Sequence, residues 1–78
     1  MTDYENLKGS YAATIQLALV ANAGYHNIKI ANEGIHEFCK HFVENGNYPE
    51  YEKTIMKQEL EILKKTFEEE IEIRYQVR

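Results

Sequence analysis

The chain has 78 residues, with 13 acidic and 9 basic side chains, a net charge of −4 and one cysteine, Cys39. This length allows one small domain with a thin core, and it excludes an enzyme that carries a separate cofactor domain. Hydrophobic residues make up 44% of the chain, which is typical of a folded protein rather than a disordered one.

The first predicted element covers residues 11–21, and residues 1–10 before it are expected to form an N-terminal arm or a short helix. Apolar residues at every second position of this stretch favour a strand. They are Tyr11, Ala13, Ile15, Leu17, Leu19 and Ala21. The same stretch also fits a helix, because Leu7, Tyr11 and Ile15 are four residues apart. The pair Gly9-Ser10 argues for the strand, since glycine weakens a helix interior.

A turn and a second strand follow. Asn22-Ala23-Gly24 has the composition of a tight turn, and Gly24 is free to take a positive φ angle. Residues 25–30 alternate again, with Ile28 and Ile30 on the same side. The two segments therefore predict a β-hairpin.

Two helices and a last strand complete the predicted fold. Asn32 is a good N-cap for a short helix that ends at Asn45-Gly46, and Pro49 starts a second helix that runs to about Glu68. Residues 71–78 alternate cleanly and predict a strand. The whole chain, residues 1–78, is then a single α+β domain: a three-stranded antiparallel sheet, made of the hairpin and the C-terminal strand, with two helices in the order β-β-α-α-β.

The second predicted helix has two apolar stripes. One contains Met56, Leu60, Leu63 and Phe67, and the other contains Tyr51, Ile55 and Ile62. A helix needs only one stripe to meet its own core. The second stripe is covered either by the preceding helix or the N-terminal arm, or by a partner. In the second case Tyr51, Ile55 and Ile62 form a homodimer interface or a contact with another protein.

The net negative charge is confined to the same region. Between Glu50 and Glu72, eight glutamates stand against four lysines, whereas the rest of the chain has five acidic and five basic residues. Direct nucleic-acid binding depends on clustered Lys and Arg, so an acidic chain argues against it. We expect a protein partner with a basic surface, bound through tyrosines at the helix entrance and glutamates. These residues are Tyr48, Tyr51, Glu59, Glu68, Glu69, Glu70 and Glu72.

No pattern of catalytic or metal-binding residues is found in the sequence. His36 and His41 are five residues apart and point to different sides of a helix, so with Cys39 they do not form a zinc site. Cys39 lies in an apolar stripe between Phe38 and Phe42, which predicts a buried, inert thiol. We therefore expect no enzyme activity, no metal and no cofactor.

A lone cysteine and the absence of a signal or membrane segment predict a cytoplasmic protein. In size and charge alone, the chain is similar to small inhibitors that phages and mobile elements encode against host defence or nucleic-acid-processing complexes, including anti-CRISPR proteins. That resemblance implies inhibition by steric or electrostatic occlusion. The alternative is a homodimeric structural or regulatory module without an inhibitory role.

Overall fold

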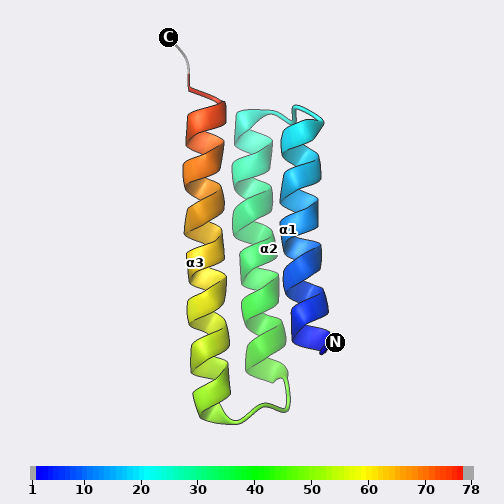
Figure 1. Ribbon diagram of the computed structural model, residues 1–78, viewed down its shortest axis with the longest axis vertical. Coiled ribbons are helices and arrows are strands. Elements are labelled where there is room, and N and C mark those ends of the chain that lie inside the picture. The colour runs from blue at the N-terminus through cyan, green and yellow to red at the C-terminus, as the bar shows by residue number, and fades with distance from the viewer. Residues whose placement is uncertain (1, 77–78) are drawn as a thin grey trace.

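The computed structural model describes residues 2–76, and in that range it contains three α-helices and no strand. The helices are α1 (Asp3–Val20), α2 (Tyr25–Asn45) and α3 (Glu50–Arg74). Short loops join them, so α1 and α3 run in the same direction and α2 runs in the opposite one (Figure 1). The predicted α+β fold and its three-stranded antiparallel sheet are therefore wrong.

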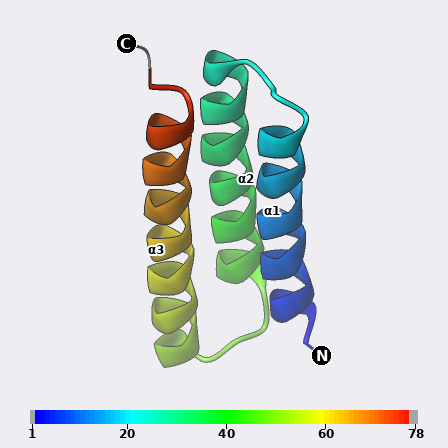
Figure 2. The same cartoon turned by 45° about the horizontal axis from the view of Figure 1, so that its top comes forward.

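The three helices form a long, narrow bundle that measures 47 × 18 × 17 Å. In both views α2 lies between its two neighbours (Figures 1 and 2). α2 has close contacts with α1 and with α3, whereas α1 and α3 approach one another much less closely. This asymmetry leaves the seam between α1 and α3 open to solvent.

α1 replaces both the predicted arm and the first predicted strand. Its start is fixed by a capping box, in which the Glu5 N–H donates to the Thr2 hydroxyl and the Thr2 N–H donates to the Glu5 carboxylate. Residues 11–21 follow the helical alternative, because Tyr11, Ile15 and Leu19 are buried four residues apart while Leu17 is exposed. In a strand all four side chains would share one face.

α2 begins at Tyr25, seven residues before the predicted N-cap, and so it includes the second predicted strand. Ile28 is buried and Ile30 is exposed, because two residues two apart on a helix point about 200° apart. The predicted end of this helix at Asn45-Gly46 is confirmed. In the preceding turn the positive φ angle belongs to Asn22, at 64°, and not to Gly24.

α3 continues six residues beyond the predicted end of its helix, to Arg74. The predicted C-terminal strand is wrong over residues 71–76, and its last two residues, 77–78, lie outside the described part of the chain. Pro49 is the N-cap of α3 rather than its first helical residue. Ile71 is buried and Ile73 is exposed, so the alternation that suggested a strand comes from opposite sides of a helix.

The core runs along the axis of the bundle and is made of residues from all three helices. Its buried hydrophobic members are Tyr4, Tyr11, Ile15, Leu19, Ile28, Cys39, Val43, Leu60, Phe67 and Ile71. The first predicted stripe of α3 is confirmed as the inward one, because Leu60 and Phe67 are buried and Met56 and Leu63 pack against the core.

One buried polar chain crosses the core and links the three helices. The Tyr11 hydroxyl of α1 donates to the side-chain oxygen of Asn32 of α2, at 2.6 Å. The Asn32 amide then donates to the backbone carbonyl of Lys64 of α3, at 3.2 Å. Asn32 is therefore a buried mid-helix residue and not the helix cap that its composition suggested.

Candidate protein-binding surface

A stripe of large apolar side chains runs along the outer side of α3. Tyr51, Ile55, Ile62 and Ile73 are 68%, 52%, 66% and 73% exposed, and we call these four residues the α3 stripe. At about 100° per residue they fall within an arc of roughly 40°, so they form one line. At about 1.5 Å per residue the line is roughly 33 Å long. No described part of the chain covers it.

The stripe contains the three residues predicted as a dimer interface and adds a fourth. Of the two explanations for the second stripe, coverage by the preceding helix or by the N-terminal arm is therefore wrong, because Tyr51, Ile55 and Ile62 all remain exposed. Ile73 was missed because its segment was assigned to a strand. The signal was present in the sequence, since Tyr51, Ile62 and Ile73 are spaced by 11 residues, which is close to three helical turns.

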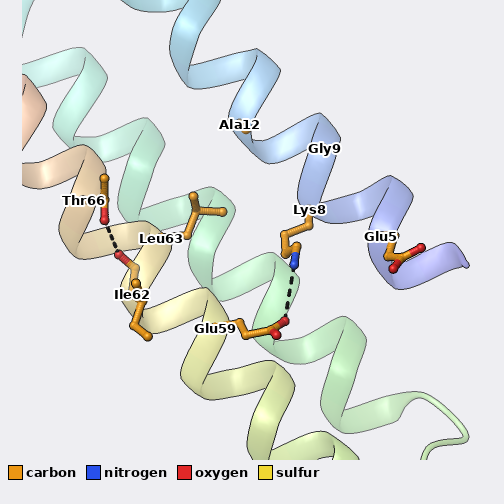
Figure 3. A pocket seen from close by; sticks show the side chains of 8 residues that line it. All are labelled: Glu5, Lys8, Gly9, Ala12, Glu59, Ile62, Leu63 and Thr66. Carbon is orange, nitrogen blue, oxygen red and sulfur yellow. Dashed lines mark hydrogen bonds and ion pairs between the residues drawn. The ribbon is translucent and has the colours of Figure 1, made fainter. Parts of the chain in front are cut away.

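A groove lies beside the stripe, in the open seam between α1 and α3 (Figure 3). Its volume is about 410 Å³, and small residues of α1, Gly9 and Ala12, stand opposite Ile62 and Leu63 of α3. A Cβ atom added at Gly9 would meet no atom within 4 Å, so the α1 wall is open at this point. Large apolar side chains on one wall and small ones on the other make a hollow that an apolar side chain can fill.

Polar contacts hold α1 to α3 at one end of the groove. The Lys8 ammonium lies 3.4 Å from the Glu59 carboxylate (Figure 3), and the Tyr4 hydroxyl donates to the same carboxylate at 2.7 Å. The Tyr4 hydrogen bond and the Lys8 charge lower the pKa of Glu59 below its ordinary value. Burial and the same carboxylate raise the pKa of Tyr4, so the phenol stays protonated and keeps its role as the donor. Glu59 therefore has a structural role within the monomer.

Of the other glutamates of the predicted site, three line one hollow beside Ile73, namely Glu68, Glu69 and Glu72, whereas Glu70 does not line it. Successive helical residues point about 100° apart, so Glu68, Glu69 and Glu70 spread around α3. Glu68 pairs with Lys64 at 3.9 Å. Glu72 lies 3.9 Å from Lys29 of α2 and accepts a hydrogen bond from Tyr25. Glu69 and Glu70 are exposed, and Glu69 lies in line with the α3 stripe between Ile62 and Ile73.

The two tyrosines at the entrance of α3 have different environments. Tyr48 is half-buried and packs against the core, where its ring lies close to Gly46. Tyr51 is exposed and belongs to the α3 stripe, and its hydroxyl donates only to the neighbouring Glu52, at 3.4 Å. The structure thus places Tyr51 at the surface with Ile55 and Ile62, whereas Tyr48 is half-buried in the loop between α2 and α3.

The side chains considered for chemistry lie away from this surface. Cys39 is fully buried, as predicted, and burial raises the pKa of its thiol, which disfavours the reactive thiolate. His36 is buried between α2 and α3; its Nε2 lies 3.2 Å from the Glu61 carboxylate, although neither ring nitrogen has a hydrogen bond of good geometry. Over residues 2–76 no three metal-binding side chains are grouped together.

Comparison with known proteins gives no relative: no protein-family model, no curated protein and no solved structure matches the chain. None of the helices described is both long and apolar enough to span a membrane. Function is therefore inferred from the surface of α3 and the groove beside it.

Proposed function

We propose that this protein is a non-enzymatic binding module, a small inhibitor or adaptor, that acts by covering the surface of another protein with α3. The observation that supports this proposal is the α3 stripe, a line of four exposed apolar side chains on a single helix. Single exposed apolar residues are ordinary, but several large ones gathered along one line of a helix, here with Glu69 between Ile62 and Ile73, commonly mark an interaction site. A helix that presents such a line to a groove is a common mode of protein recognition.

The free energy for binding comes from removing these side chains from water. Each buried aliphatic or aromatic side chain contributes roughly 1.5–3 kcal/mol, before the costs of association are subtracted. Tyr51 adds a hydroxyl that can hydrogen-bond at the edge of an interface. The stripe supplies affinity, whereas the charges beside it select the partner.

Those charges are mainly acidic, so we propose a partner with an apolar groove and basic residues at its rim. Glu69 lies in line with the stripe and Glu70 is its exposed neighbour. Both attract Lys and Arg on the partner, and both repel the phosphates of a nucleic acid. The cytoplasm, where a lone thiol stays reduced, is the compartment proposed for this interaction. The small size and acidity are also those of inhibitors encoded by phages and mobile elements.

Site-specific photo-crosslinking in cells that express the protein tests this proposal. A photoreactive amino acid replaces Ile62, at the middle of the stripe, and in a second variant it replaces Ile30 on α2. The two positions are matched because both isoleucines are about equally exposed, at 66% and 65%. We expect discrete covalent adducts at position 62 and none at position 30.

The charges are tested in the same assay by Glu69→Lys combined with Glu70→Lys. Reversal of two charges beside the stripe is expected to reduce the adduct yield, and the difference from the unchanged protein is expected to shrink as salt is raised. Equal adducts at positions 62 and 30, or none at either, contradict the proposed function.

A further inference from the structure

We propose that a second copy of this chain occupies the α3 surface, with the two α3 helices antiparallel and the two Ile62 side chains meeting at the twofold axis. This inference rests on the proposed function, because the second copy covers the same binding surface while the different protein is absent and has to leave before that protein binds. Three features of the described residues support it: a shape that fits itself, a spacing that is symmetrical about Ile62, and the position of Glu69.

The surface offers both a projection and a hollow, as a twofold interface requires. In such an interface the same patch of the two copies meets itself, so each copy has to supply both the projecting side chain and the hollow that receives it. Ile62 is 66% exposed and stands at the edge of the groove of about 410 Å³. The opposite wall is lined by Gly9 and Ala12, which leave room for an incoming side chain (Figure 3). Ile62 of each copy therefore has a hollow beside Ile62 of the other.

The two end members of the stripe lie at the same spacing on either side of Ile62. Tyr51 lies 11 residues before it and Ile73 lies 11 residues after it, which places each roughly 16 Å away along the helix. In an antiparallel pair centred on Ile62, Tyr51 of each copy meets Ile73 of the other. The large aromatic and the aliphatic side chain then pack together at both ends of the interface.

Glu69 distinguishes this arrangement from a parallel one. It lies in line with the stripe, seven residues after Ile62. In a parallel pair centred on Ile62 the two Glu69 carboxylates would face each other, and like charges held together in an interface are costly. In the antiparallel pair each Glu69 lies opposite Ile55, seven residues before Ile62, so it faces an aliphatic side chain and not a second carboxylate. The helix dipoles of the two α3 helices are also opposed rather than aligned.

The length of the α3 stripe and the number of its side chains suit a weak dimer. A standard interface buries about 800 Å² on each partner, which is about one seventh of the 5455 Å² surface of this chain. The stripe extends over roughly 33 Å of a molecule 47 Å long, so the length is sufficient. Four exposed apolar side chains on each copy, with charged neighbours, correspond to the small, reversible class of interface, with a dissociation constant roughly in the micromolar range.

Disulfide trapping tests the twofold axis directly. The natural cysteine, Cys39, is fully buried, so an introduced cysteine is the accessible one. Ile62→Cys places two thiols at the axis, within the short distance that a disulfide needs, and Ile30→Cys is the matched control on α2. With mild oxidation at micromolar protein concentration, we expect at least tenfold faster formation of a covalent dimer by I62C than by I30C.

A mixture of two variants tests the direction of the helices. Tyr51→Cys and Ile73→Cys are mixed in equal amounts and oxidised. The antiparallel arrangement predicts mixed dimers between the two variants, with few dimers of Y51C alone or of I73C alone. A parallel arrangement predicts the reverse, which would overturn the proposed geometry.

The oligomeric state provides an independent measurement. Sedimentation velocity is expected to show a concentration-dependent dimer for the unchanged chain and for Ile30→Glu, and a monomer with unchanged helical circular dichroism for Ile62→Glu. A monomer for the unchanged chain, or equal trapping of I62C and I30C, refutes self-association. If position 62 then still crosslinks in cells to a different protein, the proposed function stands and only the self-association is wrong.

Discussion

Tyr11 and Asn32 are the residues on which the packing of this small bundle depends most. Each belongs to a different helix, both are buried, and the Asn32 side chain continues the contact to α3. Buried polar groups are costly unless they are paired, and here each hydrogen bond pairs two helices. The two hydrogen bonds that connect Tyr11, Asn32 and Lys64 therefore fix the register of the three helices and also add stability.

Tyr11→Phe tests this polar chain. The ring remains, but the Asn32 side-chain oxygen loses its donor while buried, and we expect a loss of about 1–3 kcal/mol of unfolding free energy. Urea denaturation followed by circular dichroism measures it. Tyr51→Phe is the matched control, because within residues 2–76 this exposed hydroxyl hydrogen-bonds only to Glu52, and we expect a change of less than about 0.5 kcal/mol. Equal effects of the two substitutions would mean that the buried hydrogen bond adds no stability.

Glu59 gives stability a dependence on acid pH. Its pKa is lowered in the folded protein by the Tyr4 hydrogen bond and the Lys8 charge, below the ordinary value of 4.5. A carboxyl group whose pKa is lower in the folded protein than in the unfolded one stabilises the fold at pH values above its unfolded pKa. This contribution is lost as the pH falls through the pKa of the folded protein. We expect Glu59→Gln to lose less stability than the unchanged chain between pH 6 and pH 3, in denaturation curves recorded across that range.

The difference is expected to stay below about 1 kcal/mol, because Glu59 is 45% exposed and solvent screens its charge. Glu70→Gln is the matched control: Glu70 is on the same helix, is exposed and forms no ion pair with any residue of the described range. If both variants follow the unchanged chain, the contacts of Glu59 do not contribute to acid stability.

At the scale of elements, two helices, one turn and the inward face of α3 could be predicted from the sequence, whereas α1 and the sheet could not. The cause is the exposed apolar residues. Leu17, Ile30 and Ile73 each lie two residues from a buried isoleucine or leucine, and this spacing imitates the alternation of a strand. Isoleucine at the surface of a helix is unusual enough that a strand was the simpler interpretation.

The same cause explains what was missed of the binding surface. Ile73 completes the α3 stripe only when residues 71–74 are helical, so the error in the fold hid one end of the site. Tyr51, Ile55 and Ile62 were found because their helix was predicted correctly. Gly9 and Ala12 could not be assigned to the groove, since their place depends on how α1 packs beside α3.

Gly34 lies in the interior of α2, where glycine is a poor helix former. A methyl group at this position would meet no atom within 4 Å, and the residue is exposed. We therefore expect Gly34→Ala to stabilise the protein by about 0.5–1 kcal/mol, because alanine gives the unfolded chain less conformational freedom than glycine does. Urea denaturation should show a higher midpoint and an unchanged dependence of the unfolding free energy on urea concentration.

Gly46→Ala is the contrasting variant at the end of the same helix. Its methyl group would lie 2.8 Å from Cδ2 of the Tyr48 ring and 3.1 Å from the Phe42 carbonyl oxygen, so the loop or the ring has to move. We expect this variant to be destabilised. A gain in stability from Gly46→Ala would mean that Tyr48 is less firmly packed than its contacts indicate.

At the scale of the whole molecule, the proposed dimer would link stability to protein concentration. The bundle is narrow, its core is small, and a line of apolar side chains on α3 remains exposed in the monomer. A second copy that binds only the folded chain stabilises it by mass action. Above the dissociation constant, each tenfold rise in concentration adds about 0.7 kcal/mol per chain, half of the tenfold value for a dimer. For a chain of this length that amounts to about 4 °C in Tm.

We expect thermal unfolding of the unchanged chain and of Ile30→Glu to show this shift, and Ile62→Glu to unfold at a Tm independent of concentration. A constant Tm for all three proteins from micromolar to millimolar concentration is the result expected of a monomer. It would contradict the dimer and leave a different protein as the partner of the α3 stripe.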